Sequence, residues 1–192
     1  MGRAVVLSAA ILLFGCNDGA HVGKPPAPEP EDEPSSKPTA GAPADLTYEV
    51  PKEWKAEPPA MNLRKAQYRV QDRDGQEAAA EMIVFFFSGR GGTVEANLAR
   101  ARGQVSPEDE SPEAKQETFK TGPFEITLLD VHGTYTDQLS GTSTRDSRML
   151  WAFVETAAGQ YFFKLVGPRG TVSDWSAEFV TLLKSLKPVA DR

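Results

Sequence analysis

The chain of 192 residues has one cysteine and two histidines, His21 and His132. One cysteine cannot form a disulfide bond within the chain, and these counts exclude a Cys/His dyad and a histidine-rich zinc site in a folded domain. No apolar run reaches the roughly 20 residues that a transmembrane helix needs. The formal net charge is −6, without a basic cluster, which argues against binding to nucleic acid. We therefore expect no metal, no cofactor and no nucleic-acid partner.

The only cysteine, Cys16, ends the first apolar region of the chain. Residues 4–14 are apolar and follow Arg3, which is the pattern of a secretory signal peptide. The letters LFGC at 13–16 resemble the bacterial lipobox, in which the cysteine receives a diacylglyceryl group and the peptide is cut before it. The resemblance implies a signal peptide over 1–15 and a membrane anchor through lipid on Cys16. An ordinary signal peptide with a stray cysteine is the alternative.

The stretch after Cys16 is rich in proline. Seven of the fifteen prolines lie between Pro25 and Pro43, and large apolar side chains are almost absent there. Such a segment cannot offset the entropy lost on ordering. We expect a lipidated cysteine with a disordered tether over 16–44 and one globular domain over 45–192.

The domain shows strand patterns interrupted by two helix patterns. The run Met82–Phe87 is apolar on both faces, which is typical of a central strand covered on both sides. Thr93 is a good N-cap for a helix with Leu98 and Ala101 on one face. Further strands are expected within 117–137, hinged at Gly122-Pro123, and within 148–156 and 160–167. Residues 138–147 read as a polar loop.

A second helix is expected at the end of the domain, over 171–187, capped by Ser173 or Asp174. Trp175 and Phe179 lie on its apolar stripe. Consecutive strands joined by short turns pair antiparallel, and two helices can cover both faces of a sheet. The predicted fold class is therefore α+β, with a single antiparallel β-sheet of about six or seven strands covered by helices.

The element order, together with VPKEW at 50–54, GQYFFKLVGP at 159–168 and LLKSLKP at 182–188, resembles the PsbP-like fold. That fold includes the photosystem II protein PsbP and bacterial lipoproteins without assigned activity. The first helix of those lipoproteins tends to read Asn, aliphatic, any residue, Arg, Trp and, three positions on, Gln-Phe. Asn97, Leu98, Arg100 and Gln104 match this pattern, whereas Ala101 and Val105 replace its aromatic residues. These motifs concern packing and turns, so the resemblance implies a fold rather than an activity.

Few residues carry candidate chemistry. Asp130 and His132 are two apart on an expected strand and so share a face, but no nucleophile elbow presents a serine to them. We therefore predict no catalytic residues. Arg90 and Arg169 each lie beside glycine in a loop between an apolar strand and a helix. Both loops can be simple turn-and-cap structures, or the two arginines can receive an anionic group.

Two kinds of function remain open. A lipid-anchored cell-envelope protein that acts as a non-catalytic interaction module, with a protein partner in the envelope, predicts an exposed apolar patch. A carrier for a small ligand or anion, using the Arg/Gly loops, predicts a concave pocket with convergent polar groups. We expect the first, on a membrane-anchored lipoprotein facing the periplasm or exterior. An enzyme is not expected, because the sequence has no reactive constellation.

Overall fold

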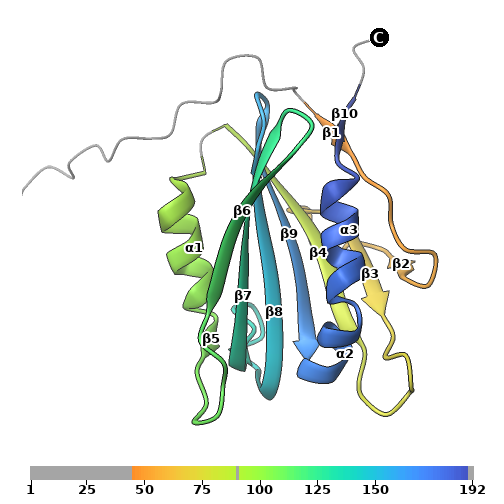
Figure 1. Ribbon diagram of the computed structural model, residues 1–192, viewed down its shortest axis with the longest axis vertical. Coiled ribbons are helices and arrows are strands. Elements are labelled where there is room, and N and C mark those ends of the chain that lie inside the picture. Colours follow the sequence, from red (N-terminus) through yellow and green to blue (C-terminus); the bar gives the residue numbers. More distant parts are fainter. Residues whose placement is uncertain (1–44, 90, 190–192) are drawn as a thin grey trace, which may run out of the picture. The chain divides into compact units, whose positions relative to one another are not determined.

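The computed structural model describes residues 45–89 and 91–189 (Figure 1). The predicted signal peptide, the tether with Cys16, and Arg90 lie outside the described residues. Nothing in the structure therefore tests the lipid anchor or the tether.

The described part contains ten strands. Their bounds are β1 (Leu46–Thr47), β2 (Lys55–Glu57), β3 (Arg64–Val70), β4 (Ala80–Ser88), β5 (Val105–Ser106), β6 (Lys115–Thr121), β7 (Phe124–Thr136), β8 (Ser143–Glu155), β9 (Gly159–Pro168) and β10 (Lys187–Pro188). Eight of them form one antiparallel sheet in the order β2-β3-β4-β9-β8-β7-β5, and β6 pairs with β7 outside this path. β1 and β10 form a separate two-stranded sheet.

The mostly antiparallel α+β architecture agrees with the sequence, but the prediction of a single sheet with six or seven strands is wrong. The main sheet has eight strands, and a second small sheet is present. β1 lies at the start of 46–50, where the alternation of Leu46, Tyr48 and Val50 predicts a strand. The strands that the sequence does not predict are short: β5 and β10 have two residues each and β2 has three. Segments this short show no alternation of apolar and polar residues, so periodicity cannot reveal them.

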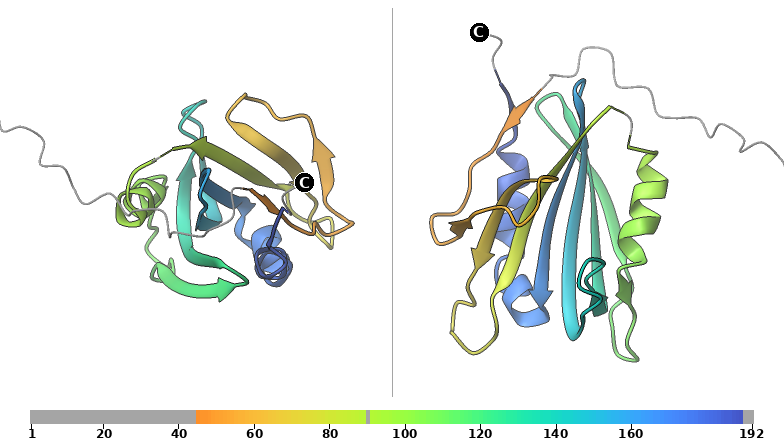
Figure 2. Two further views of the ribbon diagram at one scale, coloured as in Figure 1. Left: turned by 90° about the horizontal axis from the view of Figure 1, so that it is seen from above. Right: turned by 180° about the vertical axis from the view of Figure 1, so that it is seen from behind.

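Helices cover both faces of the sheet, as the doubly apolar strand β4 predicts. Figures 1 and 2 show α1 (Val94–Arg102) on one face and α2 (Arg169–Asp174) with α3 (Ser176–Lys184) on the other. We call these the α1 face and the α3 face. Successive residues of a strand point to opposite faces, so Phe162 and Lys164 of β9 belong to the α1 face, and Phe163 and Leu165 to the α3 face.

The larger part of the core lies on the α3 face. Val84 and Phe163 pair across β4 and β9 and are fully buried, and they belong to the same apolar cluster as Phe179 and Leu183 of α3. Burial of each such side chain stabilises the fold by about 1.5–3 kcal/mol. This packing fixes the sheet on which the site residues lie.

The final helix differs from its prediction. It is divided at Trp175, which adopts φ −107° and ψ 4° and serves as the N-cap of α3 without a side-chain bond. The Trp175 indole donates to the carbonyl oxygen of Gln71 and packs edge-on against Trp54, which holds this residue out of helical geometry. The predicted cap is wrong, because the Ser173 hydroxyl donates to the carbonyl oxygen of Arg169 instead.

The second half of the predicted polar loop at 138–147 is strand. β8 begins at Ser143, and its polar first residues pair with the end of β7. The turn between them is held by Asp137, whose carboxylate accepts hydrogen bonds from the backbone N–H groups of Leu139 and Ser140. Because the tip of this ribbon is exposed, its residues lack the apolar alternation that marks a strand in sequence.

Candidate functional site

The α1 face is only partly covered by its helix. α1 has nine residues and β8 has thirteen, so the helix is about 14 Å long and the strand about 43 Å long. Leu98 and Ala101 of α1 belong to one buried cluster with Leu129, Met149 and Val166 of the sheet. The helix therefore leaves part of the α1 face of the sheet uncovered.

An aromatic cluster occupies that uncovered part. Phe162 lies at its centre, with ring centroids 5.6 Å from Phe87, 5.7 Å from Trp151 and 5.4 Å from Phe153. Phe85 and Phe87 come from β4, Trp151 from β8 and Phe162 from β9. Edge-on ring pairs of this kind favour a rigid apolar surface.

A pocket of about 170 Å³ lies between this cluster and α1. Its apolar wall is formed by Phe85, Phe87, Trp151 and Phe162, and we call it the aromatic pocket. The volume is comparable to that of an engineered cavity of about 150 Å³ that binds benzene. The aromatic pocket can therefore hold one ring or a short acyl chain.

Lys164 contributes a cation to the lining of the aromatic pocket. The side chain is 6% exposed, and its ammonium group donates to Oε1 of Gln104 at 2.8 Å and to Oη of Tyr135 at 2.7 Å. The ammonium also lies 4.6 Å from the centroid of the Tyr135 ring. Burial lowers the pKa of Lys164 to about 8, although the charges of Asp137 and Glu81 oppose this change.

The inner side of α1 is polar at this pocket. Asn97 is 3% exposed, and its amide donates to the carbonyl oxygens of Gly91 and Thr93. Arg100 lies one turn later, is exposed and donates to Oδ1 of Asn97 at 2.6 Å. The Thr93 hydroxyl accepts from the N–H of Ala96, which confirms the predicted N-cap. The helix thus places one amide and one guanidinium at the border of the pocket.

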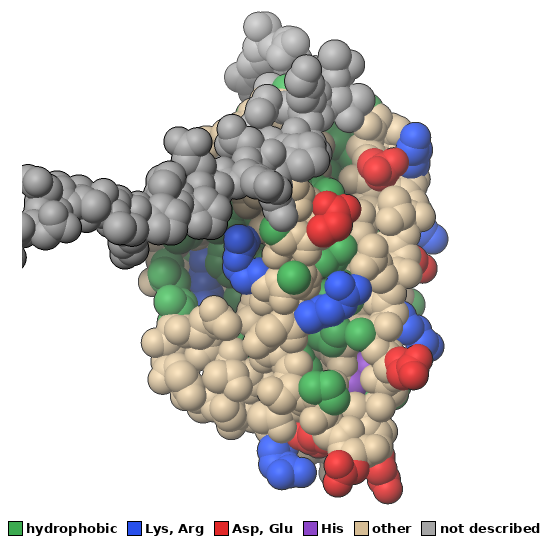
Figure 3. Space-filling model, turned by 90° about the vertical axis from the view of Figure 1, so that its left-hand side faces the viewer, with side chains coloured by type: hydrophobic (Ala, Val, Ile, Leu, Met, Phe, Trp, Pro, Cys, Tyr) green, Lys and Arg blue, Asp and Glu red, His purple; other side chains and the backbone are tan. Residues whose placement is uncertain are grey.

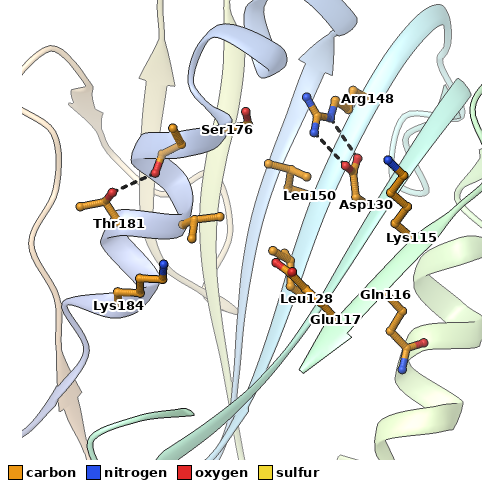
Figure 4. Close-up of a pocket in the computed structure, with 12 residues that line it drawn as sticks. Lys115, Gln116, Glu117, Leu128, Asp130, Arg148, Leu150, Ser176, Thr181 and Lys184 are labelled. Carbon is orange, nitrogen blue, oxygen red and sulfur yellow. Dashed lines mark hydrogen bonds and ion pairs between the residues drawn. The ribbon is translucent and has the colours of Figure 1, made fainter. Parts of the chain in front are cut away.

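A second, larger hollow lies on the α3 face. It has a volume of about 820 Å³ and is lined from α3, β6, β7 and β8 (Figure 4). Figure 4 shows Asp130 and Arg148 paired on the sheet, with Lys115 from β6 beside them and Lys184 on α3 across the hollow. We call this the polar hollow. Its lining mixes cations and carboxylates, so it has no single charge preference.

Asp130 and His132 share a face of β7, as their spacing predicts. Oδ1 of Asp130 lies 3.3 Å from Nε2 of His132, and the Asp130 carboxylate also accepts two hydrogen bonds from Arg148. Burial lowers the pKa of His132, against the opposing charge of Asp130. The arrangement is a polar cluster between neighbouring strands.

Arg169 is engaged within the chain. Its Nε lies 2.9 Å from Oδ1 of Asp146. At the start of α2, the carboxylate of Glu77 accepts from the N–H of Thr171 at 3.0 Å, so the chain supplies its own anion there. The neighbours of Arg90, Gly89 and Gly91, follow β4. The start of β9 pairs with the end of β4, and Arg169 follows the other end of β9.

Gly89 and Gly91 therefore lie at one end of the β4–β9 pair and Arg169 at the other. Arg90 lies outside the described residues, so the binding of a ligand by Arg90 and Arg169 stays a prediction. Among the residues that the structure describes, no group of three or more His, Cys, Asp or Glu side chains is arranged to hold a metal ion.

Large exposed apolar side chains are few among the described residues. The large ones in the described ranges are Leu63, Phe87, Leu139 and Val189. Figure 3, which views the side of α1, shows hydrophobic side chains in small groups among charged ones. None of the described helices is long and apolar enough to cross a membrane.

Comparisons with known proteins find structural neighbours only. No family model and no curated protein matches the chain. CyanoP, a PsbP from Synechocystis sp. PCC 6803, is 12% identical, with 82% of this chain and 100% of that chain covered and a TM-score of 0.48. LpqN, involved in cell envelope biogenesis of Mycobacterium tuberculosis, is 14% identical, with coverages of 79% and 90% and a TM-score of 0.44.

A protein of unknown function from Pseudomonas aeruginosa, PA94, is 14% identical, covers 76% of this chain and 99% of its own, and has a TM-score of 0.49. Likeness at this level carries no information on what this chain binds.

The sequence reasoning missed the aromatic pocket and Lys164. A signal was present, because Lys164 interrupts the apolar run Tyr161–Val166 of a strand that was expected to be buried. A charged residue in such a run is seldom buried without a partner, which marks it as a functional candidate.

Proposed function

We propose that this chain is a lipid-anchored cell-envelope protein whose folded part binds a small apolar ligand. The observation that supports this is the aromatic pocket, in which four aromatic side chains and Lys164 converge beside α1. Concave apolar sites with a few polar groups are typical of small-molecule binding. Of the two Arg/Gly loops, the first contributes Gly91 to the lining of the aromatic pocket, and Arg169 is not part of that lining.

The interaction-module hypothesis required an exposed apolar patch. The exposed large apolar side chains of the described residues are few, for example Leu139 in the β7–β8 turn and Leu63 before β3. Scattered apolar residues are usual on protein surfaces. The module therefore stays a prediction, and the pocket favours ligand binding without a chemical step.

Binding of benzamide, an uncharged ring compound, to the purified full-length chain tests the proposal. Calorimetric titration should show saturable binding, and the fluorescence of Trp151 should change. Phe87→Ser should weaken binding, because Phe87 is part of the wall and its 37% exposure makes the truncation mild for the core. Leu139→Ser is the matched control, since Leu139 is exposed and lies outside the pocket. Absence of saturable binding, or equal loss in both variants, contradicts the proposal.

The anchor rests on the lipobox resemblance at 13–16. Mass spectrometry of the mature N-terminus should show an acylated Cys16, and Cys16→Ser should leave an uncleaved precursor or a product that is released from the membrane. A mature chain with unmodified Cys16 would contradict the anchor. That result would leave the ligand-binding part of the proposal untouched.

A further inference from the structure

The charges at the aromatic pocket have one sign. Among the described residues, its charged lining residues are Lys164 and Arg100, and no carboxylate lines it. The polar hollow on the α3 face differs, because Asp130 and Glu117 line it together with its cations. A ligand in the aromatic pocket therefore meets a positive environment, whereas the other hollow offers both signs.

Lys164 has no carboxylate in direct contact within the described ranges. Its two hydrogen-bond partners, Gln104 and Tyr135, are uncharged. An ammonium group has three N–H donors, so one remains beyond these two bonds. A buried cation without a counter-ion is costly in a protein interior, and an anion that reaches it recovers part of that cost.

The nearest carboxylates are already used. Glu81 lies 2.8 Å from Nη1 of Arg64, an ion pair on β3 and β4. Asp137 accepts a hydrogen bond from the Tyr135 hydroxyl at 3.3 Å, and it also holds the β7–β8 turn. Neither carboxylate is within ion-pair distance of Lys164, so the described residues give this cation no direct counter-ion; Asp137 reaches it only through the Tyr135 hydroxyl.

Register places the cation next to the apolar wall. Lys164 of β9 pairs with Trp151 of β8 and with Ile83 of β4. Phe162, two residues before Lys164, points to the same face and pairs with Phe85. Lys164, Phe162 and Trp151 therefore project from neighbouring positions on the same face, and all three line the aromatic pocket.

From these relationships we infer that the ligand of the aromatic pocket is a small monoanion with an apolar ring or short chain, whose carboxylate pairs with Lys164. Arg100 at the border of the pocket strengthens the same preference. The inference rests on the proposed function and names the chemical class of its ligand. A carboxylate that accepts from Lys164 forms a charge-assisted hydrogen bond in a site of low polarity, where such bonds are strong.

Three ring compounds of nearly equal size separate the contributions of shape and charge. Benzoate carries a negative charge, benzamide none and benzylamine a positive charge. At about pH 7 the full-length chain should bind benzoate at least about tenfold more tightly than benzamide, and benzylamine more weakly than benzamide. This order on the unaltered protein requires no variant to fold.

Lys164→Met should remove the difference between benzoate and benzamide while benzamide still binds. Lys184→Met is the matched control, because Lys184 is an exposed lysine that lines the polar hollow, and it should keep the difference. At about pH 9.5 the preference of the unaltered chain should shrink, since Lys164 loses its proton above its pKa of about 8. Tyr135, whose pKa is raised by burial, is not the group that titrates in this range.

The outcomes distinguish the two proposals. Benzamide binding with no preference for benzoate overturns the anion inference and leaves the proposed function standing. Binding of neither compound overturns the proposed function. A preference that survives Lys164→Met assigns the anion to another cation and also overturns the inference.

Discussion

The guanidinium group of Arg148 and the carboxylate of Asp130 face each other on neighbouring strands, with Nε 2.9 Å from Oδ1 and Nη2 2.7 Å from Oδ2. The side chains are 16% and 18% exposed, so the pair is largely withdrawn from water. Two parallel hydrogen bonds fix the orientation of both groups.

Asp130→Asn should therefore destabilise the fold. The amide keeps the size of the carboxylate but leaves Arg148 without its counter-charge, and loss of one partner of a mostly buried pair costs about 3 kcal/mol. Chemical denaturation measures the loss. In a double-mutant cycle with Arg148→Met, the coupling should be about 1–3 kcal/mol. A coupling below about 0.5 kcal/mol would mean that the pair contributes as little as an exposed one.

Lys164 should make stability depend on pH in the alkaline range. Its pKa falls from 10.5 to about 8 on folding because the side chain is buried. Between these two values the unfolded chain binds more protons than the folded chain, so raising the pH through this window stabilises the fold. The charge on Lys164 costs up to about 3 kcal/mol below pH 8, and that cost is gone above pH 10.5.

The comparison with Lys164→Met isolates this effect. Other groups titrate in both proteins and cancel in the difference between their free energies of unfolding. Relative to the variant, the unaltered chain should gain up to about 3 kcal/mol between pH 8 and pH 10.5. A difference that stays constant across this range would show that Lys164 keeps its ordinary pKa, and that the ammonium group is better solvated than its burial indicates.

Sequence patterns predicted the parts of this fold that are long and regular. The run Met82–Phe87 predicted an interior strand covered on both sides, and Thr93 marked the start of α1. The strands β2 and β5 were not predicted, because a segment of two or three residues shows no periodicity. The break in the final helix at Trp175 was not predicted, because the Trp175 indole bonds to the carbonyl oxygen of Gln71, about a hundred residues earlier in the chain.

The aromatic pocket was not predicted from the sequence for a related reason. Phe85, Trp151 and Phe162 are spread over three strands, and each reads as ordinary core in its own segment. Only the pairing of β4, β9 and β8 brings them together beside Lys164. The two Arg/Gly loops were predicted as a candidate site because each is a short pattern within one stretch of sequence. Antiparallel pairing of β4 with β9 places Gly91 and Arg169 at opposite ends of the sheet.

The apolar stripe of α3 should dominate its contribution to stability. Phe179 is completely buried in the cluster on the α3 face, and Trp175 is 6% exposed. Phe179→Ala should cost about 3–5 kcal/mol, through lost burial and the cavity that remains. Thr181→Ala, on the exposed side of the same helix, should change stability by less than about 0.5 kcal/mol. Similar losses in both variants would mean that burial of the Phe179 ring does not determine the effect, since Ala has a higher helix propensity than either Phe or Thr.

Gly133 should be the glycine at which a methyl group is least tolerated on the α1 face. It has φ +143°, and a Cβ there would overlap the carbonyl of Ser106 in β5. Strain and overlap together should make Gly133→Ala cost about 2–5 kcal/mol. Gly141 is the matched control: it has φ +69° in an open turn with no atom near a Cβ, so Gly141→Ala should cost about 1 kcal/mol.

Gly133→Ala should also change ligand binding in the aromatic pocket. Ser106 follows Gln104 by two residues, and the carbonyl oxygen of Gln104 accepts from the N–H of Thr136. If the added methyl group of Gly133→Ala pushes β5 away, Gln104 moves with it. Gln104 accepts a hydrogen bond from the ammonium group of Lys164, so this contact is disturbed. Benzoate should then lose part of its advantage over benzamide in Gly133→Ala but not in Gly141→Ala. If Gly133→Ala lowers stability and the advantage is unchanged, Gln104 does not position Lys164, and Tyr135 alone orients it.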